Sequence, residues 1–439
     1  MGSWPDDVTA PAERARLADA HRRRLAAQAE RTPRQALRLA LLRQVGRRYR
    51  RTPPAAAAPQ RILVIRPDHL GDLLFAGPAL RLLRRQHPGA HIAALVGPWG
   101  EPVAARWPEA DRVLTCPFPG FTRRPKPDPL APYRLLAAEA ARLRQEAFDL
   151  ALVLRFDHWW GAWLAAEAGI PRRIGYAVPE TRPFLTDPVP YVPGRHEVVQ
   201  NLALALATGG RSPLAGLPAA LTARLPFADP SPPAADEMAE DWRLRFPLAE
   251  TDLAAADALL PPADGRPLVA IHPGSGAAVK QWRPAGWAAV ARRLAEEHAA
   301  QVVFTGSAAE ASLVEPLLAQ LTDVKPPPRS LAGRTDLGAL AAVYRRCALV
   351  IGPDSGPLHL AVAVGTPTVH LYGPVDRRTF GPWGSPQRHR VVTSDWACIP
   401  CNRLDWPEAA LAQHGCVRDI EPEAVVAEAA RLLGGRGGL

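Results

Sequence analysis

Short apolar runs alternate with amphipathic stretches along most of the chain. Three runs, at 62–65, 92–96 and 150–154, have the length and uniform hydrophobicity of strands that are covered on both faces. The stretches 72–86 and 159–168 carry apolar residues at helical spacing. Strands that alternate with helices predict βαβ units and a parallel sheet.

A second series of the same kind follows a Pro- and Ala-rich stretch at 211–235. Its predicted strands lie at 268–271, 302–305, 349–351 and 368–371, and its predicted helices at 284–298, 308–321, 336–346 and from Gly356 onward. We therefore expect two α/β halves joined near 225–265, which suits a length of 439 residues. Doubly wound sheets bind ligands beyond the carboxyl ends of their strands, so the loops that follow strands are the candidates for chemistry.

The longest uncharged stretch, 355–375, has the length of a membrane span. Gly365 and Pro367 interrupt it, so a helix, a turn and a strand are expected there instead. The N-terminal sequence lacks the apolar core of a signal peptide. Five cysteines are too few for the disulfide framework of a secreted protein, and a cytoplasmic location is expected.

The formal net charge of +10 is concentrated at the N-terminus. Residues 1–51 hold 13 arginines and 5 acidic residues, so they carry +8 of that charge and leave a nearly neutral body. A basic patch spread over a fold would suggest nucleic acid, whereas a basic arm suggests either an appendage for an anionic surface or a solvated extension. Residues 11–50 favour helix, with Leu37 and Leu41 on one stripe, and 52–59 is expected to be a stiff linker.

The loop after the first predicted strand contains Gly71 and Asp72, and Asp72 falls where the next helix begins. The glycine pattern of nicotinamide dinucleotide sites, G-x-G-x-x-G, is absent from this loop. A carboxylate at this position can accept a proton from a substrate hydroxyl group. It can equally cap the helix or complement its dipole, and the spacing alone does not separate the two roles.

The loop after the strand at 268–271 reads His-Pro-Gly-Ser-Gly-Ala-Ala-Val-Lys. Its small residues, Ser275 and Gly276 among them, let backbone N–H groups approach an anion. Lys280 adds a positive charge in a chain that has 50 arginines and only 3 lysines. We expect this loop to bind an anionic group, although a solvated Lys280 is the alternative.

A third loop follows the strand at 349–351 and reads Gly-Pro-Asp-Ser-Gly-Pro-Leu-His. Its residues Ser355, Gly356 and Pro357 would form a helix N-terminus with free N–H groups, which suits phosphate. Asp354 either caps that helix or binds the hydroxyl groups of a sugar. His359, one turn into the helix, is more often a packing residue than a ligand.

No two aspartates stand at positions i and i+2 anywhere in the chain. The D-x-D pair that would hold a divalent metal on a nucleotide diphosphate is therefore missing. A departing diphosphate would then be stabilised by helix N-termini and cationic side chains, which the second and third loops offer. The sequence favours metal-independent displacement at a diphosphate substrate, with Asp72 contributed by the opposite domain.

The motifs R-x-D-x-L-G-D, H-P-G-S, and G-x-D-S-G-x-x-H-L-A followed by G-T-P-x-V-x-L-Y-G-P occur in this order between Arg61 and Leu433. Together with the histidine-led segment 196–204, they resemble glycosyltransferase family 9, typified by the ADP-heptose:lipopolysaccharide heptosyltransferases. The resemblance implies an α/β fold of GT-B architecture, with two Rossmann-like doubly wound domains facing a cleft and a last helix that packs back on the first domain. A basic helical arm precedes them here.

On this basis we expect four parts of the chain. They are the basic arm and Pro/Ala linker at 1–59, the acceptor-side domain at 60–245, the nucleotide-sugar-binding domain at 246–420, and the terminal helix with its Gly-rich tail at 421–439.

The resemblance also implies roles for individual residues. Asp72 would be the general base that deprotonates the acceptor hydroxyl, Lys280 would contact the donor diphosphate, and Asp354 would bind the donor sugar. The remaining donor diphosphate and nucleotide contacts would come from Ser275, Gly276, Glu310, Ser355, Gly356 and Pro357, with Gly71 and His359 in support.

The reaction implied is inverting transfer of a heptose-like sugar from a nucleotide diphosphate, such as ADP-heptose, to a hydroxyl of a cell-envelope glycan or glycolipid. No cofactor or metal is expected, nucleic acid is not an expected partner, and residues 1–51 would hold the enzyme at the inner face of the cytoplasmic membrane. A sugar-nucleotide epimerase or hydrolase on the same fold is the first alternative. A non-catalytic protein whose arm binds nucleic acid is the second.

A cysteine-containing segment near the C-terminus departs from the family pattern. Cys398, Cys401, His414 and Cys416 offer the ligands of a Cys₃His zinc site. Their spacing fits no established zinc pattern, so ordinary thiols are the favoured interpretation.

Overall fold

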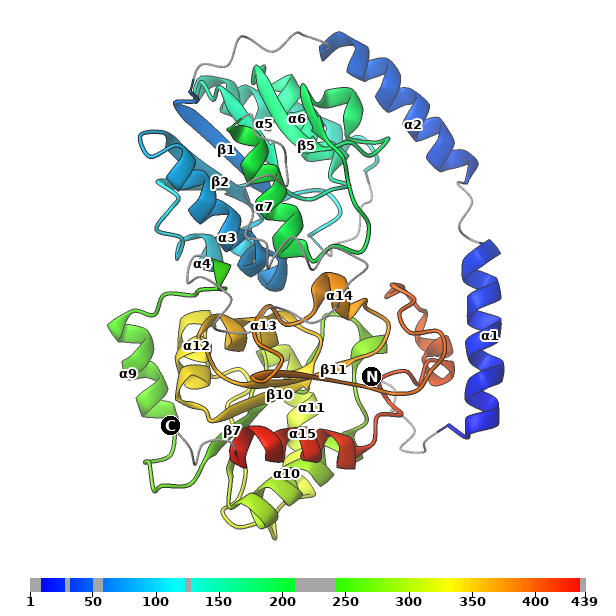
Figure 1. The fold of residues 1–439 in the computed structure, drawn as a ribbon, viewed down its shortest axis with the longest axis vertical. Helices are drawn as coiled ribbons and strands as arrows, with labels where there is room; N and C mark the ends of the chain where they lie inside the picture. Colours follow the sequence, from blue (N-terminus) through cyan, green and yellow to red (C-terminus); the bar gives the residue numbers. More distant parts are fainter. Residues whose placement is uncertain (1–8, 28–31, 50–57, 123–127, 210–241, 435–439) are drawn as a thin grey trace. The chain divides into compact units, whose positions relative to one another are not determined.

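The structure is a computed structural model that describes residues 9–27, 32–49, 58–122, 128–209 and 242–434. These residues form two compact units (Figure 1). The first unit lies within 30–230 and contains the first sheet, and the second unit combines residues 1–29 with 243–439 and contains the second sheet. The chain thus begins in the second unit, passes to the first, and returns to the second.

The first unit is built on a six-stranded parallel sheet with the strand order β3-β2-β1-β4-β5-β6. This is the doubly wound order of Rossmann-like domains. The strands are β1 (Arg61–Arg66), β2 (His91–Val96), β3 (Arg112–Thr115), β4 (Leu150–Val153), β5 (Arg172–Tyr176) and β6 (Asp187–Val189).

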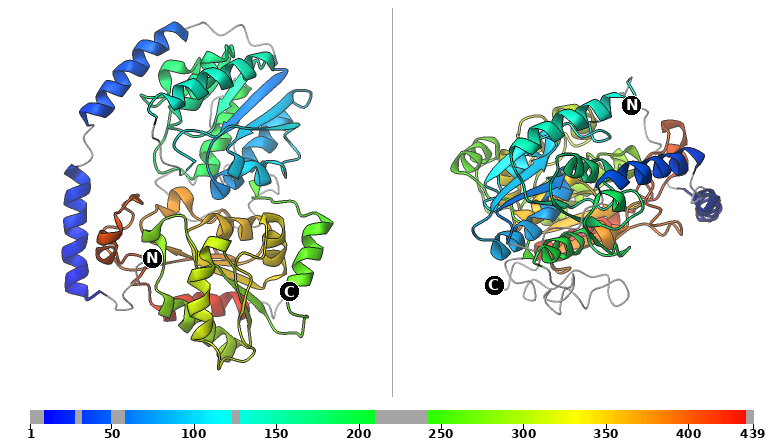
Figure 2. Two further views of the ribbon diagram at one scale, coloured as in Figure 1. Left: turned by 180° about the vertical axis from the view of Figure 1, so that it is seen from behind. Right: turned by 90° about the horizontal axis from the view of Figure 1, so that it is seen from above.

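Helices cover both faces of this sheet. The pair α3 (Leu70–Gln86) and α7 (Glu197–Thr208) packs on one face, in front in Figure 1, and the pair α5 (Ala131–Gln145) and α6 (Trp159–Glu167) lies on the other, seen in front in Figure 2. A short helix α4 (Glu101–Ala104) follows β2. Because both faces are covered, the central strands bury nearly all of their side chains, as their uniform apolar runs predict.

The second unit has a sheet with the order β12-β11-β10-β7-β8-β9. Listed from β9 to β12, this is the same doubly wound order as in the first unit. All of its strand pairs are parallel. The strands are β7 (Leu268–Ile271), β8 (Gln301–Phe304), β9 (Arg329–Ser330), β10 (Leu349–Pro353), β11 (Thr368–Tyr372) and β12 (His389–Thr393). The helices are α9 (Glu250–Leu259), α10 (Pro284–His298), α11 (Ala311–Ala319), α12 (Leu337–Arg346), α13 (Gly356–Ala363), α14 (Arg377–Phe380) and α15 (Pro422–Gly434).

The expectation that the last helix packs on the first domain is wrong. Helix α15 buries Val425, Val426 and Ala429 in the core of the second unit, where it packs against α10. These three residues form its apolar face, and that face is already covered within its own unit.

The N-terminal segment is not an appended arm, in contrast to the expectation. Helix α1 (Pro11–Ala27) places Ala18, which is fully buried, in the core of the second unit. Helix α2 (Pro33–Gly46) places Leu42 in the core of the first unit. The two helices therefore belong to different units, while the expected stiff linker at 52–59 lies largely outside the described residues.

Short 3₁₀ helices complete the described structure. They are η1 (Arg47–Tyr49), η2 (Pro98–Gly100), η3 (Arg182–Phe184), η5 (Ala278–Lys280), η6 (Ala308–Glu310) and η7 (Glu408–Gln413). The uncharged stretch 355–375 forms α13, a turn and β11, as predicted. Among the described helices, none combines the length and hydrophobicity that crossing a bilayer requires.

Candidate active site

The candidate loops follow the strands at which each sheet reverses its winding. In the first sheet β1 and β4 are neighbours, and in the second β7 and β10 are neighbours. Asp68 and Asp72 come after β1, Arg155 after β4, Lys280 after β7 and Asp354 after β10. Ligands of doubly wound sheets bind at the carboxyl ends of such strand pairs, so each unit gathers its candidates where a ligand site is expected.

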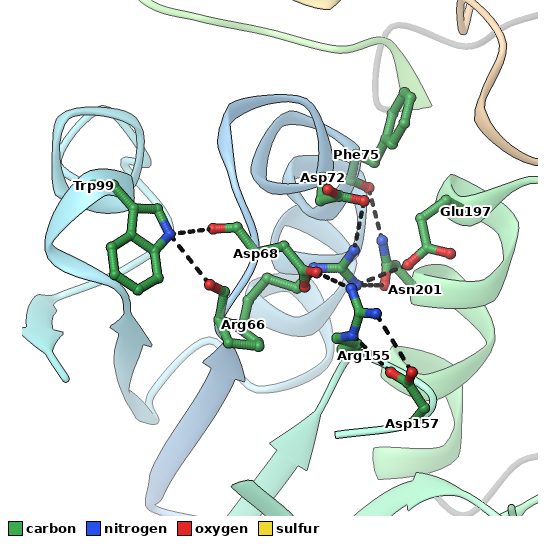
Figure 3. A network of polar contacts seen from close by, with 10 residues as sticks. Arg66, Asp68, Asp72, Phe75, Trp99, Arg155, Asp157, Glu197 and Asn201 are labelled. Atoms are coloured by element: carbon green, nitrogen blue, oxygen red, sulfur yellow. Dashed lines mark hydrogen bonds and ion pairs between the residues drawn. The ribbon is translucent and has the colours of Figure 1, made fainter. Parts of the chain in front are cut away.

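Asp72 lies in the first turn of α3 (Figure 3). It does not cap this helix, because the N-cap residue is His69. Its carboxylate accepts a hydrogen bond from Nη2 of Arg66 at 3.2 Å, and its side chain remains 31% exposed. The carboxylate is therefore held by one cation and is still accessible to another molecule.

Arg66 is the centre of a buried charge network that reaches α7. Its guanidinium lies 2.8 Å from Asp68, and Nη1 donates to Glu197 at 2.8 Å and to the side-chain oxygen of Asn201 at 3.2 Å. Asn201 in turn donates to the carbonyl of Phe75 on α3 at 3.2 Å. The last residue of β1 thus joins the two helices that pack on this face of the sheet.

Arg155 extends the network from β4. It forms ion pairs with Asp68 and with Asp157, the latter at 2.6 Å. Four carboxylates, counting Asp72 and Glu197, therefore share two guanidinium groups. The carboxylates outnumber the guanidinium groups, so the two guanidinium groups do not neutralise all of the negative charge of the network.

Burial raises the pKa of Asp72 to about 7, and the negative charges of Asp68 and Glu197 act in the same direction, against Arg66 and Arg155. Asp68 behaves differently: burial opposes its charge, but Arg66 and Arg155 hold its pKa below the usual value. One carboxylate of the network can therefore take up a proton near neutral pH while its neighbour stays ionised. A general base is most effective when its pKa lies near the working pH.

In the second unit Lys280 lies in η5, and its Nζ donates to Asp354 at 3.0 Å. His359 is buried, and its Nε2 lies 3.8 Å from the same carboxylate. Burial opposes the charge on Asp354, but Lys280 and His359 lower its pKa well below the usual range. Asp354 is not the helix cap, since that position belongs to Ser355.

The start of α13 offers hydrogen-bond donors. Its first residue, Gly356, has a backbone N–H, its second, Pro357, has none, and Ser355 makes no side-chain cap to the backbone. The hydroxyls of Ser275 and Ser355 are both buried and have no hydrogen-bond partner within the parts of the chain that the structure describes. Unpaired donors at a helix start beside a lysine can bind an anion such as a phosphate group.

Glu310 lies against the loop that follows β7. Ser307 donates to its carboxylate from both N–H and hydroxyl at 2.8 Å, which closes a capping box at η6. A Cβ atom on Gly274 would stand 1.9 Å from Oε1 of Glu310, so only glycine fits this position without moving the carboxylate. The structure therefore brings Glu310 to the same loop as Ser275 and Gly276.

The four candidate zinc ligands do not gather into a metal site. No set of three or more His, Cys, Asp or Glu side chains among the described residues is arranged to hold a metal ion. The His414 ring stacks against Trp406, at 3.7 Å, and against His21 of α1, at 4.1 Å between ring centroids. Cys398, Cys401 and Cys416 are free thiols.

The sequence analysis assigns no role to Arg66, Asp68, Arg155 or Glu197. Arg66 and Asp68 stand in the motif R-x-D-x-L-G-D, so their fixed spacing from Asp72 was a usable signal. Glu197 is 131 residues from Arg66, and nothing in the local sequence predicts that pairing.

Two doubly wound units, each with candidate site residues at its winding reversal, define the GT-B fold of nucleotide-sugar glycosyltransferases. A solved structure with this fold is the E. coli ADP-heptose lps heptosyltransferase II, which matches with a TM-score of 0.63 and 23% identity over 86% of this chain and 99% of that one. At this identity the likeness establishes the fold alone.

The chain belongs to glycosyltransferase family 9 (heptosyltransferase), whose profile matches residues 137–409. It is 27% identical over 392 residues to lipopolysaccharide heptosyltransferase 2 of Salmonella typhimurium. That alignment covers 86% of this chain and 99% of the relative. Lipooligosaccharide heptosyltransferase 2 of Campylobacter jejuni is 29% identical over 171 residues, and that alignment spans about half of the relative, 52%. The predicted family, fold class and transferase activity are thereby confirmed, in preference to the epimerase, hydrolase and nucleic-acid-binding alternatives.

Proposed function

We propose that this glycosyltransferase moves a heptose from ADP-heptose to a hydroxyl group of the lipopolysaccharide core, with inversion at the anomeric carbon. The observation that carries the proposal is the partly exposed carboxylate of Asp72, whose pKa is raised to about 7. The printed names of the relatives, which are heptosyltransferases of lipopolysaccharide or lipooligosaccharide, support the choice of donor and acceptor.

In the proposed reaction Asp72 accepts the proton of the acceptor hydroxyl as its oxygen attacks the anomeric carbon of the donor. The new C–O bond forms on the face opposite the diphosphate, and the bond to the diphosphate oxygen breaks. Lys280 and the backbone N–H of Gly356, the first residue of α13, stabilise the charge on the leaving ADP. Asp354, paired with Lys280 at 3.0 Å, binds donor sugar hydroxyls, and Glu310 binds the ribose.

We further propose that this reaction needs neither a metal nor another cofactor. The support is the absence of a D-x-D pair from the 439 residues, together with a lysine and a helix start that can hold a diphosphate. A cytoplasmic location, at the membrane face that carries the acceptor, is part of the same proposal.

The test is incubation of the purified chain with a panel of nucleotide sugars, with and without a crude glycolipid extract. Mass spectrometry should show heptose added to the glycolipid only with ADP-heptose, and NMR should show the inverted anomeric configuration. EDTA should leave the rate unchanged. Consumption of the donor without acceptor, or loss of activity in EDTA, would contradict the proposal.

Asp72→Asn serves as the matched inactive variant. It should bind ADP with the affinity of the unchanged chain, measured by calorimetry, and transfer roughly 10²–10⁴-fold more slowly, because a positioned base contributes about that factor. Transfer at the unchanged rate would remove Asp72 as the base.

A further inference from the structure

The exposed face of α2 carries leucines where a soluble surface normally carries polar residues. Leu42 packs in the core of the first unit and is 1% exposed, and Leu39 is also buried, at 5%. Leu37 and Leu41, four residues apart on the other side of the helix, are 73% and 51% exposed. Two large apolar side chains one turn apart therefore form a patch that nothing in the described residues covers.

The same helix and the 3₁₀ turn after it are rich in arginine. Five arginines, with no acidic residue, occupy α2 and η1: Arg34, Arg38, Arg43, Arg47 and Arg48. All five are exposed, and the described residues provide an ion pair to none of them. The helix therefore combines unpaired positive charge with exposed apolar side chains, the composition of helices that lie in a bilayer interface.

Helix α1 has the same number of arginines but a different role. Arg14 pairs with Asp395 and Asp419, Arg16 with Glu13 at 3.6 Å, and Arg22 and Arg23 both with Asp19. Most of the positive charge on α1 is thus paired, and its buried face is used within the second unit. Among the described residues, α1 leaves only Arg24 without an ion pair, whereas all five arginines of α2 and η1 lack one.

The first unit also has two exposed apolar side chains at the start of α5. The large exposed hydrophobic residues in the described parts of the chain are Leu37, Leu41, Leu130, Tyr133 and Leu404. Four of these five lie in the first unit, two on α2 and two at the start of α5.

Aromatic contacts connect the end of α2 with the start of α5. The ring of Tyr133 lies 5.9 Å from that of Trp163, and Nε1 of Trp163 donates to the hydroxyl of Tyr49 at 3.3 Å. Tyr49 ends η1, directly after α2, and its carbonyl accepts from Arg173 at 3.0 Å. Trp and Tyr favour the headgroup level of a bilayer, where an apolar ring and a polar tip are both satisfied.

We propose that α2 and the start of α5 form a docking surface for an anionic lipid bilayer. The inference rests on the proposed function in one respect, that the acceptor is a glycolipid in the same bilayer. A bilayer offers anionic headgroups to Arg34 and Arg38 and hydrocarbon to Leu37 and Leu41 at once. Nucleic acid would match the arginines but not the exposed leucines.

The test is co-sedimentation of the full chain with vesicles of phosphatidylcholine alone or with 30% phosphatidylglycerol. Binding should require the anionic lipid and weaken with salt. Arg34→Gln with Arg38→Gln should lower the partition coefficient about 30-fold at low ionic strength, since each basic residue contributes about a factor of five. Leu37→Ser with Leu41→Ser should lower it at least about tenfold through lost apolar contact.

Two matched controls make the same chemical changes elsewhere. Arg16→Gln with Arg23→Gln removes two exposed charges from α1, and Leu404→Ser removes an exposed leucine from the second unit. Both should bind vesicles like the unchanged chain. Equal losses in the controls, unchanged binding of the α2 variants, or a dimer in solution that the leucine changes dissociate would each overturn the proposal.

The binding assay uses no sugar nucleotide, so its result does not depend on the proposed reaction. The α2 variants lie outside the catalytic network and should transfer sugar to a detergent-dispersed acceptor at the unchanged rate. An active enzyme that ignores vesicles would refute only the docking surface, whereas an inactive enzyme that binds them would refute only the proposed function.

Discussion

At the scale of single residues, the most informative feature is the pairing of Arg66 with Glu197. Glu197 takes part of the charge of Arg66, which would otherwise stabilise the ionised form of Asp72, and it adds its own negative charge nearby. Burial contributes most to the raised pKa of Asp72, the charge of Asp68 follows, and the charge of Glu197 acts in the same direction. Glu197 is therefore a positioning residue that sets the protonation of the proposed base without touching substrate.

The pH dependence of transfer tests this role. Because a base must be ionised, kcat/KM of the unchanged chain should rise with pH and level off above about 7. Glu197→Gln should move the midpoint of that profile to lower pH.

Glu146→Gln is the matched control, since it breaks an ion pair with Arg112 at the first residue of β3, the opposite end of the same sheet. It should leave the midpoint in place. A variant of Glu197 that loses rate equally at every pH would show a structural role only.

Ionisation of Asp72 should lower the stability of the folded chain, although transfer requires the ionised carboxylate. Its pKa is higher in the folded chain than in the unfolded one, so ionisation opposes folding increasingly as the pH rises from about 4 to about 7. Asp72→Asn removes that cost, and its melting temperature should exceed that of the unchanged chain more at pH 8 than at pH 4. Scanning calorimetry at both pH values measures this, and a difference that does not grow with pH would contradict the raised pKa.

At the scale of elements, central strands were predictable and edge elements were not. The apolar runs at 62–65 and 268–271 predict β1 and β7 because both faces of these strands are covered. Strand β9 has only two residues, Arg329–Ser330, and no apolar run marks it. In α2 the leucines occur on two faces, and the face that is buried is decided by η3, where Pro183 packs against Gly46.

The candidate site divides in the same way. Asp72, Lys280 and Asp354 could be predicted because each stands between a strand and the end of the first turn of the α-helix that follows it, and Lys280 contacts Asp354 from another such segment. Glu197 and Arg155 could not, because their partners are 131 and 87 residues away along the chain.

The close contact between Gly274, in the loop after β7, and the carboxylate of Glu310 can be tested by substitution. Gly274→Ala would place a methyl group against Oε1 of Glu310 and displace the end of that flexible side chain. The fold should persist, but ADP affinity should fall about tenfold, the cost of one hydrogen bond to a charged group.

Glu310→Ala should cause a similar loss of affinity, and the double variant should lose no more than either single one. Gly89→Ala is the control, since a methyl group there meets nothing within 4 Å. Additive losses in calorimetric titrations with ADP would show that Gly274 does not act through Glu310.

At the scale of the whole molecule, the chain connects its two units in two places. Residues up to 29 belong to the second unit, 30–230 to the first, and 243 onward to the second again. The fragment that would remain N-terminal after a cut between 210 and 241 therefore still carries α1, whose Ala18 is buried in the other fragment's core.

We expect the two fragments to stay together after cleavage at a protease site introduced into 210–241. Ala18→Glu should weaken their association at least tenfold, because it places a charge in an apolar core. Ala20→Glu, at an exposed position of the same helix, should not. Analytical ultracentrifugation of the cut chains compares them, and equal association of both variants would exclude α1 as the link.

The short connection between α1 and α2 limits the distance between the ends of these two helices. Ala27 ends α1 in the second unit and Thr32 caps α2 in the first, and five peptide steps join their Cα atoms. A fully extended chain spans at most about 3.6 Å for each step, so these two points cannot move more than about 18 Å apart while both helices stay docked. The four residues between Ala27 and Thr32 therefore set an upper limit on the distance between the end of α1 and the start of α2.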